Sequence, residues 1–262
     1  MAGRKERQRK LARERHVRQQ ARRAQQARRA QIATAIGVVC VVIVGLGVGG
    51  FFVFRSGNTK ATAASASATP TASPVATHCT YTSKPPAARN VGMPPTTPDS
   101  TASYQATIAT NRGDVVIDLL NSKATCTVNS FVYLAAKKYF NNTKCHRLTT
   151  SSPLYVLQCG DPTGTGSGGP GYKFADENLA GATYRAGTVA MANSGANTNG
   201  SQFFLVYKNS TLAPSYTPFG TIVSGLGIIQ DVAKQGSDNS NGSGDGHPKE
   251  SVVIESVTIK KT

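Results

Sequence analysis

Histidine, aspartate and serine are the side chains of a hydrolase triad, and the chain carries them at His146, Asp161 and Ser201. A serine nucleophile of this kind often stands in a Gly-x-Ser-x-Gly turn between a strand and a helix. Ser201 stands instead in the sequence Asn-Gly-Ser-Gln-Phe, so we do not expect hydrolase chemistry. We interpret His146 as a structural residue of a strand, held by hydrogen bonds.

The chain has five cysteines. Cys40 falls in an apolar segment, and the other four are Cys79, Cys126, Cys145 and Cys159. In an oxidising compartment such cysteines are expected to form disulfides, and three pairings are possible. The alternative is a zinc site made from Cys79, Cys145, His78 and His146, but it lacks a Cys-x-x-Cys pair or a recognised spacing. We therefore predict disulfides, with no metal and no cofactor.

Three blocks of polar and aromatic residues follow one another in the second half of the chain. They are Cys-His-Arg at 145–147, Tyr-Val-Leu-Gln-Cys-Gly-Asp at 155–161, and a block at 187–204 that begins Gly-Thr-Val-Ala-Met-Ala-Asn and ends Asn-Gly-Ser-Gln-Phe-Phe. Two strands and a turn would explain the glycines and asparagines of the last block, but not the whole string. Together the blocks resemble the signatures of cyclophilins, the prolyl isomerases, over residues 104–261. With the N-terminal features described below, they suggest a membrane-anchored bacterial form.

The resemblance implies which residues act on a prolyl bond. Rotation about a peptide bond has a barrier of about 18–20 kcal/mol. It needs a donor that favours the twisted amide, rather than a nucleophile or a metal. Arg147 matches the family's catalytic arginine, and Gln158 matches the residue expected to hold its guanidinium. The matching proline pocket consists of Tyr155, Val156, Phe204 and Leu212.

Further matches concern contacts with the substrate. Ala192 and Asn193 match the pair that bonds with the substrate backbone. Gln202 matches a further polar contact, and Tyr216 stands where many relatives carry His. The chain has no Trp, and Thr211 occupies the position of the Trp with which many cyclophilins contact cyclosporin. We therefore expect weak binding of that inhibitor.

Hydrophobic periodicity predicts a mainly β domain over residues 104–262. The expected elements are a hairpin over 104–120, helices over 127–138 and 226–234, and a final strand over 251–259. Gly236 is a plausible C-terminal stop for the second helix. With the resemblance, this pattern predicts a closed antiparallel β-barrel capped by two α-helices, in a monomeric domain.

Residues 1–31 carry much of the positive charge. The formal net charge is +16, and twelve of the 29 Lys and Arg residues lie within the first 30 positions. Because the charge is concentrated in a tail, we expect no nucleic-acid partner. The segment is predicted to be a solvated cytoplasmic arm. Its basic residues, between positions 4 and 29, would contact anionic lipid head groups, each contributing about 1 kcal/mol.

Residues 32–54 contain no charged side chain and are almost wholly apolar. As a helix they would extend roughly 34 Å, enough for the hydrocarbon core of a bilayer. We predict one transmembrane helix; the alternative is a signal peptide cleaved near residues 61–64. Because the basic residues precede the span, the positive-inside rule places the N-terminus in the cytoplasm and the following chain outside. The predicted location is therefore the cell membrane, with a single pass.

Residues 55–103 are rich in Ala, Ser, Thr and Pro and are predicted to be a linker. Cys79 and Tyr81 interrupt this composition, so we expect part of the second half to dock on the domain.

These features predict an isomerase that acts on X-Pro bonds of exported proteins outside the cytoplasmic membrane and assists their folding. Its partners would be proline-containing polypeptides. The alternative is a catalytically weak binding or scaffold module, tethered to the membrane, that holds proline-containing segments. A third interpretation gives the main role to the basic arm, through a cytoplasmic partner or a membrane patch.

Overall fold

The computed structural model of the chain describes residues 76–262. The predicted basic arm and the predicted span at 32–54 lie outside the described residues. Within residues 76–262, no helix combines the length and the apolar character needed to cross a membrane.

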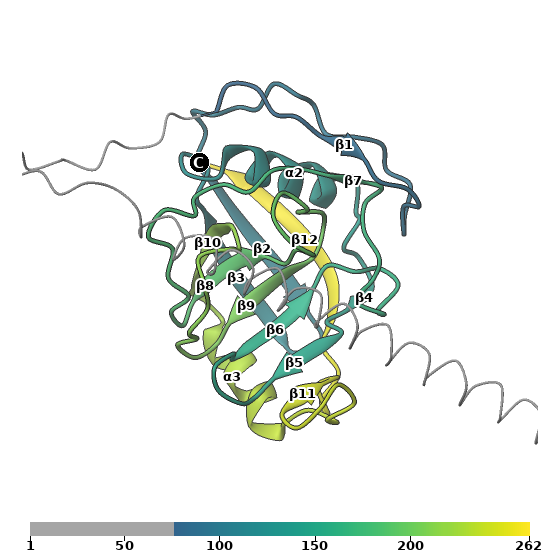
Figure 1. Ribbon diagram of the computed structural model, residues 1–262, viewed down its shortest axis with the longest axis vertical. Coiled ribbons are helices and arrows are strands. Elements are labelled where there is room, and N and C mark those ends of the chain that lie inside the picture. Colours follow the sequence, from purple (N-terminus) through teal and green to yellow (C-terminus); the bar gives the residue numbers. More distant parts are fainter. Residues whose placement is uncertain (1–75) are drawn as a thin grey trace, which may run out of the picture. The chain divides into compact units, whose positions relative to one another are not determined.

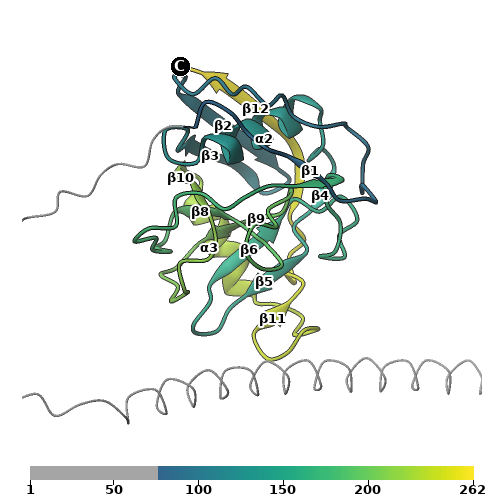
Figure 2. The ribbon, with the colours of Figure 1, turned by 45° about the horizontal axis from the view of Figure 1, so that its top comes forward.

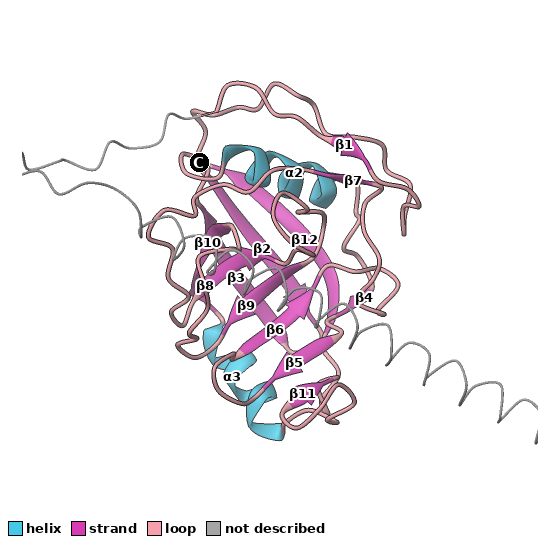
Figure 3. Cartoon of the chain, in the orientation of Figure 1, coloured by secondary structure: helices cyan, strands magenta, loops and turns pink. Residues whose placement is uncertain are grey.

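The centre of the described domain is a curled antiparallel sheet of ten strands (Figure 1, Figure 3). In spatial order the strands are β11 (Asp245–Gly246), β5 (Arg147–Thr149), β6 (Val156–Cys159), β9 (Phe203–Val206), β8 (Thr188–Met191), β10 (Pro218–Ser224), β3 (Gly113–Leu119), β2 (Tyr104–Thr110), β12 (Val253–Lys261) and β4 (Thr143–Lys144). A second sheet pairs β1 (Thr82–Ser83) with β7 (Tyr172–Lys173), and the helices are α2 (Thr125–Ala136) and α3 (Leu226–Gln235). The predicted mainly β class is confirmed.

The predicted hairpin is formed by β2 and β3. These strands pair from Tyr104 opposite Leu119 to Thr110 opposite Gly113. Alternate side chains of both strands are buried, because successive residues of a strand point to opposite faces. The buried ones are Ala106, Ile108, Val115, Ile117 and Leu119.

Both predicted helices are present, and each buries an apolar stripe. Val128 and Phe131 of α2 are buried, as are Ile229 and Val232 of α3. The α2 helix packs against β12 and the α3 helix against β3, and Figure 1 shows them near opposite ends of the sheet. The α3 helix ends before Gly236, whose φ of +82° suits glycine.

The expectation of a closed barrel needs correction. The hydrogen-bonded order of the strands ends at β11 and at β4, and no ladder among the described residues joins these two. The edges are connected by the chain itself, because β4 continues into β5 through Cys145 and His146. The backbone N–H of Cys145 bonds to Val252 beside β12 (2.9 Å), whereas that of His146 bonds to Gln158 on β6 (3.0 Å). The kinked segment divides its hydrogen bonds between two neighbours, so the sheet is a curled half-barrel.

The two faces of strands β6, β8 and β9 carry different apolar clusters. One face belongs to the main core and contributes Leu157, Cys159, Val189, Met191, Phe203 and Leu205. The other face carries a smaller cluster built on Val156, Ala190, Phe204 and Val206. Since strand residues alternate between faces, this second cluster lies outside the main core.

Residues 76–103 pack against the domain. Cys79 forms a disulfide with Cys126 at the start of α2. The Nη1 of Arg89 donates to the carbonyls of Tyr139 (2.9 Å) and Asn141 (2.8 Å). In Figure 2 the segment that carries β1 runs past α2. We call residues 76–103 the docked segment.

Candidate active site

Arg147, Gln158, Phe204 and Ala190 lie in one row across four neighbouring strands. Arg147 is opposite Gln158 in the β5–β6 ladder, Gln158 is opposite Phe204 between β6 and β9, and Phe204 is opposite Ala190 between β9 and β8. Residues directly opposite each other in an antiparallel sheet project from the same face. The row therefore brings a guanidinium, an amide and an aromatic ring together outside the main core.

The guanidinium of Arg147 is held by two side chains. Its Nη1 donates to Gln158 Oε1 (3.3 Å), as the sequence analysis expects. Its Nε and Nη2 donate to the two carboxylate oxygens of Asp245, at 2.8 and 2.6 Å. A guanidinium has five N–H donors, so three such bonds leave two for another ligand. Asp245 is not among the residues that the sequence indicated.

The ion pair shifts the pKa values of both partners. Hydrogen bonding to the carboxylate of Asp245 raises the pKa of Arg147, although burial opposes this. The same bond lowers the pKa of Asp245. The side chain of Arg147 is 33% exposed and that of Asp245 26% exposed. The arginine is thus fixed and charged, yet still accessible to a ligand.

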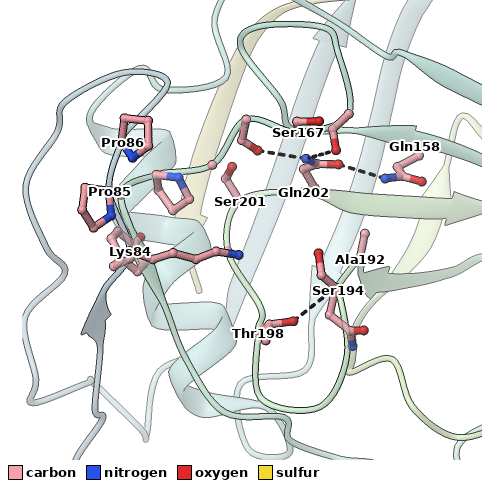
Figure 4. Close-up of a pocket in the computed structure, with 18 residues that line it drawn as sticks. Lys84, Pro85, Pro86, Gln158, Ser167, Ala192, Ser194, Thr198, Ser201 and Gln202 are labelled. Carbon is pink, nitrogen blue, oxygen red and sulfur yellow. Dashed lines mark hydrogen bonds between the residues drawn. The ribbon is translucent and has the colours of Figure 1, made fainter. Parts of the chain in front are cut away.

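A chain of amides supports the catalytic pair. Gln158 Nε2 donates to Gln202 Oε1 at 2.9 Å, a bond drawn in Figure 4. Gln202 Nε2 donates in turn to the carbonyls of Gly166 (3.0 Å) and Gly168 (2.9 Å). These bonds fix the orientation of both amides, so the oxygen of Gln158 faces Arg147.

Three of the four predicted pocket residues, together with the predicted contact residue Tyr216, lie in the smaller apolar cluster. Val156 and Phe204 are buried in it, and Leu212 and Tyr216 pack against it. The rings of Phe204 and Tyr216 meet edge to face, with centroids 5.6 Å apart. Tyr155 lies elsewhere: it packs against the main core, and its ring is 6.1 Å from that of Tyr207. The structure thus groups Val156, Phe204, Leu212 and Tyr216, but not Tyr155.

The remaining predicted contacts, Ala192 and Asn193, follow β8. Ala192 packs beside the smaller cluster, and its N–H bonds to the carbonyl of Gln202 (2.9 Å). Asn193 Nδ2 donates to the carbonyl of Ser215 (2.7 Å), which ties it to the loop that carries Tyr216. All predicted site residues except Tyr155 therefore lie around one region of the sheet.

Tyr184 is a second site residue that the sequence did not indicate. It is buried in the smaller cluster, where its hydroxyl donates to the carbonyl of Tyr216 (2.8 Å) and accepts from its N–H (3.0 Å). Tyr184 thereby supports the pocket from behind. Its sequence surroundings give no signal of this role, and Asp245 gives only a weak one, as an acidic residue in the loop sequence Gly-Ser-Gly-Asp-Gly.

The alternative of a hydrolase triad finds no support in the geometry. Ser201 Oγ donates to the carbonyl of Gly160 (2.7 Å), and the carboxylate of Asp161 accepts from Thr163 and Gly168. His146 is buried, but neither ring nitrogen has a hydrogen-bond partner among the described residues. The expectation that hydrogen bonds hold this ring was therefore wrong. Burial lowers its pKa and favours the neutral imidazole.

The cysteines outside the apolar segment form two disulfides. Cys79 pairs with Cys126, and Cys145 pairs with Cys159. The prediction of disulfides is confirmed, and one of the three possible pairings is selected. The zinc alternative loses Cys79 and Cys145 as thiolate ligands. Within residues 76–262, no group of His, Cys, Asp and Glu is arranged to hold a metal ion.

Comparisons with known proteins agree with this geometry. The family model for cyclophilin-type peptidyl-prolyl cis-trans isomerases matches residues 105–259. The chain is 50% identical over 189 residues to a probable peptidyl-prolyl cis-trans isomerase B of Mycobacterium leprae, covering 67% of this chain and 61% of that protein. It is 39% identical over 174 residues to peptidyl-prolyl cis-trans isomerase A of Mycobacterium tuberculosis, covering 60% of this chain and 93% of that protein. The match thus spans about three fifths of the length of the first of these relatives.

A solved structure gives the same result. A cyclophilin-type peptidyl-prolyl cis-trans isomerase of Cryptosporidium parvum superposes with a TM-score of 0.54 and 32% identity, covering 61% of this chain and 99% of that one. The same protein has been crystallised in the presence of the dipeptide Ala-Pro. The family model covers more than half of this chain, and the chain therefore belongs to the cyclophilin-type peptidyl-prolyl cis-trans isomerase family.

Proposed function

We propose that the protein catalyses cis-trans isomerisation of X-Pro bonds in polypeptides. One observation carries the proposal. Arg147, with two N–H donors left after its bonds to Gln158 and Asp245, shares a sheet face with the apolar cluster around Phe204. A cationic donor beside an apolar pocket suits a proline ring joined to a polar amide.

The proposed mechanism breaks no covalent bond. Rotation removes the double-bond character of the C–N bond, and the nitrogen lone pair then becomes available as a hydrogen-bond acceptor. A donor fixed in advance stabilises this twisted state more than the planar amide. In this chain Arg147 is the donor, Gln158 and Asp245 hold it still, and the cluster around Phe204 holds the proline ring.

An Arg147→Ala variant of the full chain, in detergent, tests this proposal. We expect kcat/KM for a proline tetrapeptide to fall at least tenfold, which corresponds to about 1.4 kcal/mol of lost transition-state stabilisation. Arg112→Ala is the matched control, because Arg112 pairs with Glu250 beside the β2–β3 turn. A folded wild type without turnover would contradict catalysis and favour the proline-peptide binding module.

We further propose that the domain works outside the cytoplasmic membrane, anchored by residues 32–54, on exported proteins. The uncharged segment and the basic residues before it support this topology. The two disulfides suit an oxidising compartment. Uncatalysed prolyl isomerisation takes tens of seconds, so it limits the folding of newly exported chains.

Protease treatment of intact bacterial cells that express the full chain tests this topology. We expect an added protease to remove the domain while a cytoplasmic marker survives. A chain lacking residues 1–31 reports on the basic arm, and reduced flotation with anionic vesicles would support its contact with lipid head groups. A domain that becomes digestible only after lysis would overturn the proposed location.

A further inference from the structure

A polar pocket of about 390 Å³ adjoins the candidate active site (Figure 4). One side is formed by residues already assigned to the site, among them Gln158, Asn193 and Gln202. The other side includes Lys84, Pro85 and Pro86 of the docked segment. These three residues precede the part of the chain that the family model matches, residues 105–259. The pocket therefore combines the common domain with a wall outside it.

This wall is fixed in place by the backbone. The β1 strand pairs with β7 immediately before Lys84, whose N–H bonds to the carbonyl of Gly171 (2.8 Å). The N–H of Ala88 bonds to the carbonyl of Gly169 (2.8 Å). At Gly171 a Cβ atom would lie 2.8 Å from the Cβ of Ala87, so the two segments approach as closely as glycine allows. The wall is thus held on both sides of its two prolines.

Of the residues in the described part of the chain that line the pocket, Lys84 is the one that carries a charge. Figure 4 shows its ammonium group directed away from the docked segment, toward the part of the pocket near Ser201 and Thr198. No carboxylate of residues 76–262 lies within ion-pair distance of Lys84. The Asp161 carboxylate behind the Gly168 loop is engaged by hydrogen bonds from that loop. Among the described residues, the pocket therefore offers one cation without a counter-charge.

We propose that Lys84 makes this pocket a binding site for an acidic side chain, Asp or Glu, of the polypeptide whose proline occupies the active site. The inference rests on the proposed function, because that function places a peptide beside Gln158 and Gln202. An extended chain spans about 10 Å in three residues, so the test covers the three positions on each side of the proline. Lys84 then favours substrates that carry an acidic residue near the proline, a preference that the apolar cluster around Phe204 cannot provide.

Peptide pairs that differ only in Glu or Gln test the proposal with the full chain. Glu is placed in turn at each of the three positions before and after the proline. At one position we expect kcat/KM to be about twofold to fivefold higher for Glu than for Gln, the range of a solvent-accessible ion pair. The preference should shrink in 0.5 M salt. Lys84→Gln should abolish it, and Lys84→Glu should shift it toward peptides with Lys at that position.

Lys173→Gln is the matched control. Lys173 pairs with Thr82 across the β1–β7 sheet but does not line the pocket, so its variant should keep the preference for Glu. Equal values for Glu and Gln peptides at all six positions would overturn the inference and leave the isomerase proposal intact.

If the protein shows no turnover, binding measurements distinguish the proposed role of Lys84 from the proposed isomerase function. The dissociation constants of fluorescently labelled Glu and Gln peptides, measured by anisotropy, should show the same ratio and the same dependence on Lys84. A Lys84-dependent preference without catalysis would support the inference and contradict the proposed function. Equal dissociation constants would overturn the inference whatever the activity.

Discussion

At the scale of single residues, the site depends on how Arg147 is held. An arginine side chain has several rotatable bonds, and ordering it costs up to about 2 kcal/mol of conformational entropy. The bidentate bond to Asp245 and the bond to Gln158 meet that cost within the folded domain. The donor is therefore in position before a peptide arrives, which is the requirement for electrostatic stabilisation of a transition state.

Asp245→Asn should lower activity through Arg147. The amide oxygen of the new Asn can accept one of the two hydrogen bonds from Arg147, but the negative charge of the carboxylate is lost. The guanidinium therefore becomes more mobile. We expect kcat/KM for a proline tetrapeptide to fall about threefold to tenfold, mostly in kcat. The pair is partly exposed, so the free energy of unfolding should fall by less than about 1 kcal/mol.

Asp231→Asn is the control for this experiment. Asp231 also forms an ion pair, with Lys234 at 2.7 Å, but on the exposed side of α3. Its loss should change neither kcat nor the free energy of unfolding appreciably. Equal activity of the Asp245 variant and the wild type would show that Gln158 alone suffices to hold the arginine.

His146 should make the domain less stable in mild acid. Burial lowers its pKa below the ordinary 6.5, and this outweighs the nearby charge of Asp161. Below about pH 6.5 the unfolded chain therefore binds a proton that the folded chain does not. The free energy of unfolding should fall as the pH drops from 7.5 to 5, and the fall should be smaller in His146→Gln. Urea denaturation at several pH values measures both slopes, and parallel slopes would contradict the prediction.

At the scale of elements, the turn after β6 depends on Gly160. Its φ is +89°, and a Cβ atom there would lie 2.3 Å from the carbonyl oxygen of Ser201. A hydrogen bond also joins these two segments, because Ser201 Oγ donates to the carbonyl of Gly160. A side chain at Gly160 would therefore push β6 away from the start of β9, and with it Gln158 away from Gln202.

Gly160→Ala and Gly164→Ala form a matched pair that tests this argument. Gly164 also has a positive φ, +67°, but nothing lies within 4 Å of its Cβ position. We expect Gly164→Ala to cost about 1 kcal/mol for backbone strain alone. Gly160→Ala should cost about 3 kcal/mol or more, because a backbone collision is added. Thermal unfolding of both variants measures the difference, and equal losses would refute the collision.

At the scale of the whole molecule, the two faces of the curled sheet have different roles. One face of β6, β8 and β9 closes the main core, and the other carries the row from Arg147 to Ala190. The docked segment then encloses the neighbouring pocket from outside the sheet. Its attachment at Cys79 to Cys126 joins residues that are 47 positions apart in the sequence.

Removal of this disulfide should release the docked segment before the domain unfolds. In Cys79→Ala/Cys126→Ala, we expect trypsin to cut after Arg89 much faster than in the wild type, as measured by mass spectrometry of the fragments. Cys145→Ala/Cys159→Ala is the control, because that disulfide joins the chain before β5 to the end of β6 and leaves the segment attached. Equal cleavage rates in the two double variants would show that backbone pairing alone holds the segment.

Local sequence was enough to predict several elements. The β2–β3 hairpin and both helices follow from apolar periodicity and turn residues, which act over a few neighbouring positions. The order of the three polar blocks likewise indicated Arg147, Gln158 and most of the contact residues, through resemblance to a family. Each of these signals lies within one short stretch of the chain.

The tertiary structure decided what depends on distant partners. Asp245 reaches Arg147 across 98 positions, and the disulfide partners of four cysteines are set by strand and helix packing. Phe203 and Phe204 are equally apolar neighbours, and only the pairing of β9 between β6 and β8 sends one to the core and the other to the site. Periodicity fixes which residues share a face, whereas the choice of face and of partner depends on contacts that form when the whole sheet curls.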